Sequence, residues 1–239
     1  MRPLLGKTAL ITGAGGGIGR ALAIHLAEAG ANLALAGRDE TKLAESCALA
    51  RTAGVEALML PGDLTAPGYP AECVRQAANG LGRLDILINN AGVALSKPFE
   101  AITPEEYDHV MAVNTRAPFL LCQAALPYLR ESKGSILNIG SVVSHKGYPM
   151  QSVYGASKHA LIGFTKALAS EMLKDGIRVH MLSPGTVSTG MASAVRPDLD
   201  GNALIQPEEL AEVALFLLTR KSAVIDEIQA HRPGKEPFT

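Results

Sequence analysis

The sequence predicts a doubly wound α/β fold, in which a mostly parallel sheet of about seven strands carries helices on both faces. Three observations support this prediction. Short apolar runs alternate with helical segments, the first run (residues 8–11) ends in a glycine-rich turn, and no linker divides the chain. Alternation of this kind favours parallel pairing, because a helix must carry the chain back between parallel strands. We therefore expect one domain covering residues 1–239.

The expected strands are short apolar runs bounded by glycine or polar residues. They cover residues 8–11, 32–36, 55–60, 86–88, 136–139, 177–182 and 224–230. The expected helices have apolar residues at helical spacing. They cover residues 18–29, 39–54 with Asp39 as N-cap, 104–130 with a bend at Pro118, 153–173, and a segment that starts at Pro207. The least periodic segment, 188–206, is interpreted as a substrate flap within the domain.

The composition argues against several classes of protein. Hydrophobic residues make up 47% of the 239-residue chain, charged residues 19%, and the formal net charge is −1, which is unlike a nucleic-acid-binding surface. The 3 cysteines form no CxxC pair, so we expect neither disulfides nor a metal site. No apolar run approaches the roughly 20 residues of a membrane helix, and residues 1–7 are too short for a signal peptide. A cytoplasmic protein is expected.

The glycine-rich turn points to a dinucleotide. Gly13, Gly17 and Gly19 lie between the first expected strand and the first expected helix. A pyrophosphate must approach this backbone closely, and the N-terminus of the helix offers unpaired N–H groups and partial positive charge. The pattern indicates a Rossmann domain, although a glycine-rich loop without a ligand is the alternative reading of the glycines alone.

The end of the second strand selects between the two nicotinamide cofactors. An acidic side chain there would bind the adenosine ribose and favour NAD, but the chain has Gly37-Arg38. A guanidinium binds a 2′-phosphate through charge-assisted hydrogen bonds, so NADP is favoured over NAD. The alternative is that Arg38 is only a solvated surface residue.

Three residues in the middle of the chain suggest proton transfer to or from a carbonyl oxygen. Tyr154 and Lys158 are four positions apart and would share one helix face, where an ammonium can lower the pKa of a phenol. Ser141, at the end of the fifth expected strand, can donate a hydrogen bond to a substrate oxygen as charge develops there. A YxxxK pair alone would more often be a pair of surface residues. Ser141 and the glycine turn favour a role in proton transfer instead.

These motifs resemble the short-chain dehydrogenase/reductase family, in its compact single-domain subtype. The segments 12–19, 89–92 and 184–185, together with the tetrad Asn114, Ser141, Tyr154 and Lys158, match family motifs in order over nearly the whole chain. The resemblance implies that Tyr154 is the general acid or base and that Lys158 holds the nicotinamide ribose and tunes Tyr154. It also implies that Asn114 anchors a water of the proton relay, although Asn114 can be read as a residue of the helix bend.

The cofactor-binding residues follow from this resemblance and from the argument on Arg38. They are Thr12, Gly13, Gly15, Gly17, Ile18, Gly19, Arg38, Asp63, Leu64, Asn90, Ala91, Gly92, Tyr154, Lys158, Pro184, Gly185, Val187 and Thr189.

The chain departs from the family at its C-terminal end. Many members continue from the last strand into Asp-Gly-Gly, whereas this chain has His231-Arg232-Pro233-Gly234. Closer to the site, His145 and Lys146 could attract an anionic substrate, but solvated side chains are the more common reading.

The expected function is NADP-linked hydride transfer between the nicotinamide and a carbonyl or secondary alcohol, with a small-molecule substrate. A 3-oxoacyl thioester, a sugar or polyol, and a small ketone remain open as substrate classes. The alternatives are a non-catalytic dinucleotide-binding regulator on the same fold and a sugar-nucleotide epimerase, which usually needs a larger C-terminal region. The resemblance also implies a homodimer or homotetramer, built through the helices of residues 104–130 and 153–173. The candidate apolar residues of that surface are Ala124, Leu126, Leu161, Phe164 and Leu168.

Overall fold

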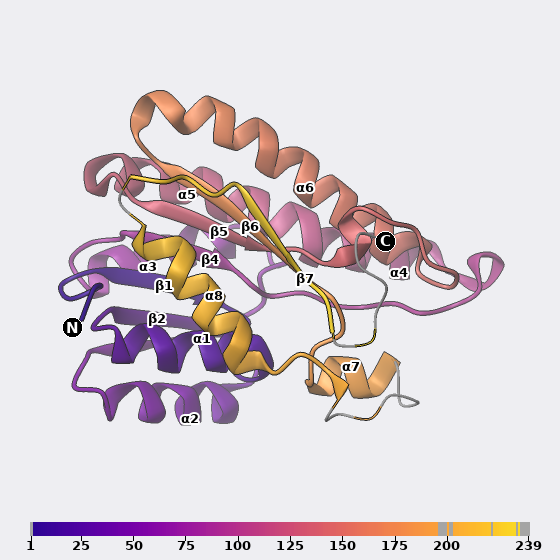
Figure 1. Cartoon of the computed structure of the whole chain (residues 1–239), viewed down its shortest axis with the longest axis horizontal. Helices are drawn as coiled ribbons and strands as arrows, with labels where there is room; N and C mark the ends of the chain where they lie inside the picture. The colour runs from indigo at the N-terminus through magenta and orange to yellow at the C-terminus, as the bar shows by residue number, and fades with distance from the viewer. Residues whose placement is uncertain (1, 196–199, 201–202, 221, 233, 235–239) are drawn as a thin grey trace.

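The protein has a seven-stranded sheet in the order β3-β2-β1-β4-β5-β6-β7, and every neighbouring pair is parallel (Figure 1). The computed structural model describes residues 2–195, 200, 203–220, 222–232 and 234. β1 lies between β2 and β4, so the strand order reverses at the β1/β4 boundary, where doubly wound sheets bind their ligands. The predicted fold class is confirmed.

The strands agree closely with those expected from the sequence. Their bounds are β1 Thr8–Thr12, β2 Asn32–Gly37, β3 Ala57–Pro61, β4 Ile86–Asn89, β5 Ser135–Ile139, β6 Arg178–Pro184 and β7 Glu227–Ala230. The first, fourth and fifth strands are buried along their whole length, which is why they read as continuous apolar runs.

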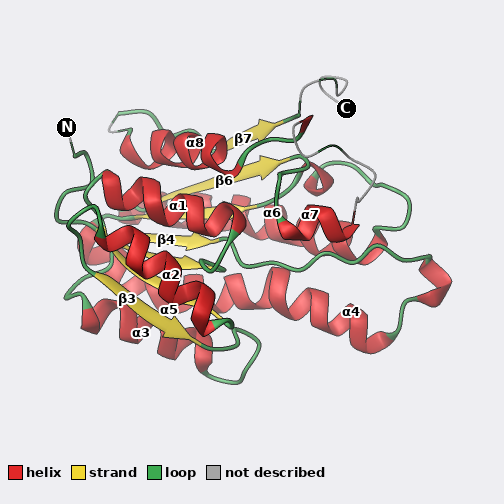
Figure 2. Ribbon diagram, turned by 90° about the horizontal axis from the view of Figure 1, so that it is seen from below, coloured by secondary structure: helices red, strands yellow, loops and turns green. Residues whose placement is uncertain are grey.

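The helices cover both faces of the sheet (Figure 2). Their bounds are α1 Gly17–Glu28, α2 Glu40–Arg51, α3 Tyr69–Gly80, α4 Pro104–Met111, α5 Ala117–Ser132, α6 Ser152–Met172, α7 Gly190–Val195 and α8 Pro207–Thr219. Apolar side chains of α1, α2 and α8 form the core on one face, and those of α3, α5 and α6 form the core on the other. No helix within the described residues is long and apolar enough to cross a membrane.

The expected helix over residues 104–130 is divided by one turn of π-helix. α4 and α5 are separated by the π-helical residues Ala112–Arg116. The N–H of Ala117, which follows this segment, donates to the carbonyl of Ala112. Pro118 lies in the first turn of α5 and has no N–H to donate to the carbonyl four residues before it, that of Asn114. The proline therefore acts on the preceding turn, and Asn114 sits in an irregular helical segment of a kind that is frequent at functional sites.

α3 is absent from the expected elements. Its buried residues are Pro70, Cys73, Val74, Ala77 and Ala78, and the last four have helical spacing. The amphipathic pattern of this helix was therefore present in the sequence, although its mean hydropathy is low. The helix begins after Gly68, which has a φ of 79°, and has a proline in its first turn.

A buried carboxylate joins β1 to β4 at the amino ends of the strands. Asp85 is 2% exposed, and it accepts hydrogen bonds from the N–H of Thr8, from Lys7 Nζ and from Arg83 Nε at 2.7–3.0 Å. Burial acts to raise the pKa of Asp85, but the hydrogen bonds from Arg83, Lys7 and Thr8 outweigh it and the pKa lies below its ordinary value. The charged carboxylate is thus the form that the folded state stabilises.

We predict that Asp85→Asn lowers the free energy of unfolding at pH 7 by about 1–3 kcal/mol, because two cations and an N–H lose a charged acceptor. The folded pKa lies below the unfolded value, near 3.8, so this contribution is present above pH 3.8 and is lost as pH falls through the folded value. Urea unfolding at a fixed protein concentration and several pH values measures it. Asp175→Asn, which breaks a surface pair with Arg130, is the control and should cost less than about 1 kcal/mol. Equal losses in the two variants would contradict the prediction.

Candidate active site

One cavity of about 360 Å³ lies along the carboxyl ends of the strands. Its walls come from the segments that follow β1, β4, β5, β6 and β7, and from α6 and α7. Parallel pairing brings these segments together although they are far apart in the sequence. The predicted site residues that line it are Gly13, Gly17, Ile18, Asn90, Ala91, Gly92, Ser141, Tyr154, Lys158, Pro184, Gly185, Val187 and Thr189.

The glycine turn is packed too tightly for side chains. A Cβ at Gly13 would lie 2.9 Å from the Cα of Ala91, and one at Gly19 would lie 2.2 Å from the carbonyl oxygen of Gly13. Gly17 has a φ of 51°, in the region that favours glycine. α1 begins here after Gly16, and no described side chain caps its first N–H groups. This bare helix N-terminus, open to the cavity, fits the pyrophosphate of a dinucleotide.

Thr12 and Asn90 support the turn. Thr12 Oγ1 accepts hydrogen bonds from the N–H groups of Asn90 and Ala91 at 3.0 and 3.1 Å. Asn90 Nδ2 donates to the carbonyl oxygens of Thr12 and Gly13 at 2.9 and 3.2 Å. Thr12 is buried and does not line the cavity, so its hydroxyl joins the ends of β1 and β4.

The residues expected at the adenosine end lie beyond the cavity, at the ends of β2 and β3. Arg38 and Asp63 are exposed and Leu64 is buried. The N–H of Thr65 lowers the pKa of Asp63 most, followed by the Thr65 hydroxyl, and the charge of Arg38 lowers it further. Arg38 and Asp63 are therefore close enough for their charges to interact.

Gly15 also lies outside the cavity wall, beside α2. Its carbonyl accepts from Arg20 at 2.8 Å, and a Cβ on it would lie 3.1 Å from the Cβ of Lys42. Lys42, like Arg20, is thus a basic residue beside the glycine turn that the sequence reasoning missed, and its ammonium lies 3.4 Å from Asp39. Asp39 caps α2 as predicted, accepting from the N–H of Lys42 at 3.0 Å.

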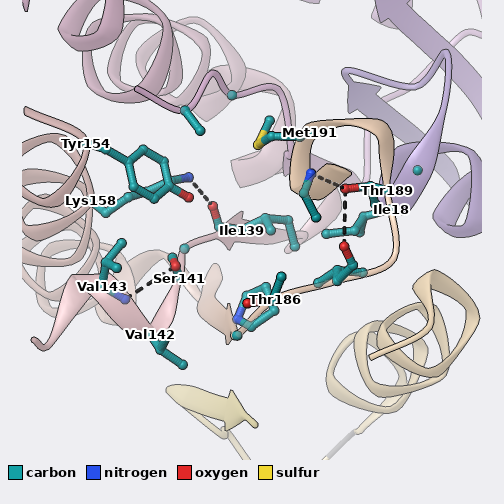
Figure 3. A pocket seen from close by; sticks show the side chains of 18 of the residues that line it. Ile18, Ile139, Ser141, Val142, Val143, Tyr154, Lys158, Thr186, Thr189 and Met191 are labelled. Atoms are coloured by element: carbon teal, nitrogen blue, oxygen red, sulfur yellow. Dashed lines mark hydrogen bonds between the residues drawn. The ribbon is translucent and has the colours of Figure 1, made fainter. Parts of the chain in front are cut away.

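Ser141, Tyr154 and Lys158 reach the same cavity from two elements (Figure 3). Ser141 follows β5, whereas Tyr154 and Lys158 lie one turn apart on α6. Lys158 is buried, donates to the carbonyl of Ile139 at 2.9 Å, and has its Nζ 5.9 Å from the centroid of the Tyr154 ring. The predicted proximity of the three side chains is therefore present in the structure.

Burial is the largest influence on the pKa values of Tyr154 and Lys158. It raises the pKa of Tyr154, and a hydrogen bond with Ser141 acts in the opposite direction. It lowers the pKa of Lys158 to about 8. In the protein alone, loss of hydration outweighs the hydrogen bond from Ser141, so the pKa of Tyr154 lies above its ordinary value, and the effect of Lys158 on it stays a prediction. A phenol that keeps its proton at neutral pH is suited to act as an acid.

Asn114 holds the wall of the cavity from the π-helical turn. Its Oδ1 accepts from the N–H of Val93 at 2.8 Å, and its Nδ2 donates to the Val93 carbonyl at 2.8 Å and to Ser157 Oγ at 3.0 Å. Ser157 in turn donates to the carbonyl of Tyr154 at 2.7 Å. The amide connects the segment after β4 to α6 and does not itself line the cavity.

Comparison with known proteins gives the same interpretation as the geometry. A family model described as short chain dehydrogenase matches residues 7–200. An uncharacterized oxidoreductase of Thermotoga maritima is 38% identical over 207 residues, which cover 86% of this chain and 79% of the relative. The chain belongs to the short-chain dehydrogenase/reductase family.

Two solved structures of this family align over nearly the whole chain. A metagenomic short-chain oxidoreductase in complex with NADP has a TM-score of 0.85 and 32% identity, covering 98% of this chain and 100% of its own. A 3-ketoacyl-(acyl-carrier-protein) reductase from Brucella melitensis complexed with NADH has a TM-score of 0.85 and 31% identity, covering 95% of this chain and 97% of its own. This protein is accordingly an oxidoreductase that uses a nicotinamide cofactor.

The basic residues that line the cavity of this dehydrogenase differ from those that the sequence suggested near the substrate. His145 lies 2.5 Å from Glu227 and Lys146 lies over the ring of Tyr148, and neither lines the cavity. His231 and Arg232 line it instead. Sequence reasoning noted this pair only as a departure from the family, and its position after the last expected strand was the available signal.

Part of the expected flap also reaches the cavity. Thr189, Met191 and Ala192 line it, and α7 covers Gly190–Val195. Residues 196–199 and 201–202 of the expected flap lie outside the described residues. Within those that are described, no group of three His, Cys, Asp or Glu side chains is placed to hold a metal ion.

We predict that Gly19→Ala weakens NADPH binding by at least about tenfold, because the new methyl would meet the backbone of the glycine turn at 2.2 Å and displace it. Fluorescence titration of NADPH measures the loss. Gly163→Ala on α6 is the matched control, since nothing lies within 4 Å of its Cβ position. It should bind NADPH normally and gain about 0.5–1 kcal/mol of stability. Unchanged binding by Gly19→Ala would contradict the tight-turn argument.

Proposed function

We propose that this short-chain dehydrogenase is an NADPH-dependent reductase of carbonyl compounds that also oxidises the corresponding secondary alcohols. The observation that carries the proposal is the convergence of Ser141, Tyr154 and Lys158 on one cavity beside a tight glycine turn. A dinucleotide-binding regulator would have no use for all three groups.

Each side chain has a distinct task in reduction. The nicotinamide supplies the hydride to the carbonyl carbon. Tyr154 gives its phenolic proton to the oxygen as negative charge develops there, and Ser141 donates a hydrogen bond to that oxygen. Lys158, with a pKa of about 8, is mostly positive at neutral pH and stabilises the phenolate left behind. In oxidation the same phenolate accepts the proton of the alcohol.

The cofactor is proposed to be NADP, with NAD less favoured. Support comes from the exposed guanidinium of Arg38 at the end of β2 and from Lys42, whose backbone lies against Gly15. The acidic residue beside Arg38 is already engaged, because Asp39 caps α2. One solved relative is complexed with NADP and another with NADH, so family membership alone leaves the choice open.

Several further expectations belong to this proposal. They are a single domain over residues 1–239, a substrate flap at 188–206, a cytoplasmic location, and an Asn114-anchored water in the proton relay. A screen of 3-oxoacyl thioesters, sugars or polyols, and small ketones with both cofactors would identify the substrate class.

Assembly into a homodimer or homotetramer is proposed through α5 and α6. Phe164 and Leu168 are partly exposed on α6, and Ala124 and Leu126 are partly exposed on α5. Leu161, which the sequence also suggested for this surface, is 1% exposed and belongs to the core. Sedimentation decides the oligomeric state.

We predict that Tyr154→Phe lowers turnover about 100-fold to 10,000-fold while NADPH still binds, because only the proton donor is removed. Ser141→Ala should lose turnover with little change in cofactor affinity, and Lys158→Met should lose both. Steady-state rates and NADPH titrations distinguish the three patterns. Near-normal turnover by Tyr154→Phe with any accepted carbonyl would overturn the mechanism.

We predict that wild-type protein binds NADPH more tightly than NADH and that Arg38→Leu removes about 1–3 kcal/mol of this preference, the range for a hydrogen bond to a charged group. The ratio of kcat/KM for the two cofactors measures it. Arg75→Leu is the matched control, since Arg75 is exposed on α3 and pairs with Glu72 of the same helix. A preference for NADH, or an unchanged ratio in Arg38→Leu, would refute the assignment.

A further inference from the structure

We propose that Arg232, beside His231, binds a carboxylate of the substrate, so that the enzyme acts on oxo acids or the corresponding hydroxy acids. The inference rests on the proposed function and names the substrate class for it. Its starting point is the pair His231 and Arg232, which lines the cavity where the sequence departs from the family.

The strand order assigns this pair to the substrate rather than to the cofactor phosphates. Along the carboxyl edge the order is β1, β4, β5, β6, β7, with the glycine turn after β1 and Ser141 after β5. Parallel strands lie about 4.8 Å apart, so Arg232 after β7 is roughly 10 Å from the Ser141 end and roughly 20 Å from the glycine turn. Arg38 lies still farther away, after β2.

The backbone of the pair is held against β6. β7 is parallel to β6 with Ala230 opposite Pro184, and the N–H of Gly185 bonds to the carbonyl of Ala230 at 2.7 Å. A Cβ on Gly185 would lie 3.8 Å from both His231 Cα and the Arg232 nitrogen. The residues that follow β7 are therefore positioned by the sheet itself, next to the loop that continues from β6 into the cavity wall.

Among the residues that the structure describes, Arg232 has no acidic partner. Arg232 forms no ion pair or hydrogen bond with another described residue, and no Asp or Glu is among the described residues of the cavity wall. The nearest acid along β7, Glu227, is five residues back, about 16 Å away in an extended strand. Glu227 is also already engaged by His145 and by Ser183, at 2.5 and 2.7 Å.

Arg232 lines a cavity whose described wall holds no acidic side chain, so a ligand oxyanion is the partner that would match its guanidinium. Its planar donors fit the two oxygens of a carboxylate. One permanent positive charge balances one negative charge, which favours a carboxylate over a doubly charged phosphate. The cavity wall also carries the apolar side chains of Val142, Val143 and Met191, which suit a short carbon chain between the carbonyl and the carboxylate.

The test compares oxo acids with their methyl esters. The probes are 3-oxobutanoate, 4-oxopentanoate and 5-oxohexanoate, each as the acid and as the ester. Dissociation constants are measured by calorimetry on protein saturated with NADP⁺, which cannot reduce them, and kcat/KM is measured with NADPH. At one chain length the wild-type protein should prefer the acid by about 10-fold to 100-fold.

Arg232→Gln should abolish this preference, because it weakens binding of the acid. Binding of the ester and of NADPH should be unchanged. Arg232→Lys, which keeps the charge but loses the planar donors, should retain part of it. Arg75→Gln, on α3 and outside the cavity, is the control and should behave as wild type.

Absence of an acid preference in wild-type binding, or an equal loss of acid and ester in Arg232→Gln, would overturn the inference. If the acid binds preferentially through Arg232 but no probe or other carbonyl is reduced, the inference stands and the proposed reductase function fails. Binding and turnover thus separate the two proposals.

Discussion

The parallel alignment of seven strands is the constraint on which the rest of this dehydrogenase depends. Because every strand runs the same way, the segments after β1, β4, β5, β6 and β7 all emerge at one edge. The tightest point of this arrangement is the junction of β1 and β4, where the Thr12 hydroxyl and the Asn90 amide bridge the two strand ends. The bare N-terminus of α1 is presented to the cavity from that junction. The geometry of the glycine turn is thus a consequence of sheet register as much as of glycine content.

Much of this arrangement was predictable because the responsible signals are local. A buried parallel strand reads as an apolar run, and the seven runs give the strands to within a few residues. The glycines of the turn are visible in the sequence. They are needed because a side chain would clash there, as the contacts of a Cβ at Gly13 and at Gly19 show. The four-residue spacing of Tyr154 and Lys158 places them on one face of any helix. Ser141 could be grouped with Tyr154 and Lys158 because it lies at the end of the fifth expected strand.

The features that were missed depend on tertiary context. α3 is amphipathic but has a low mean hydropathy, and no helix was expected there although its helical spacing was present in the sequence. The irregularity assigned to Pro118 is a π turn before it, because a proline removes a donor from the turn that precedes it. The raised pKa of Tyr154 depends on how much water the fold removes, which spacing alone does not contain. Lys42, His231 and Arg232 became interesting only once the fold showed what they lie beside.

The edge position of β7 has an implication for how such an enzyme can diverge. β7 pairs only with β6, and the described chain after Arg232 contributes no further strand. The acid–base residues belong to β5 and α6, and the phosphate turn belongs to β1 and α1, in the interior of the sheet. Mutations at the end of β7 can therefore accumulate with little disturbance of the acid–base residues or of the phosphate turn. The fold thus separates the reaction centre from the segment after β7, and substrate choice can be altered by changing a few residues there.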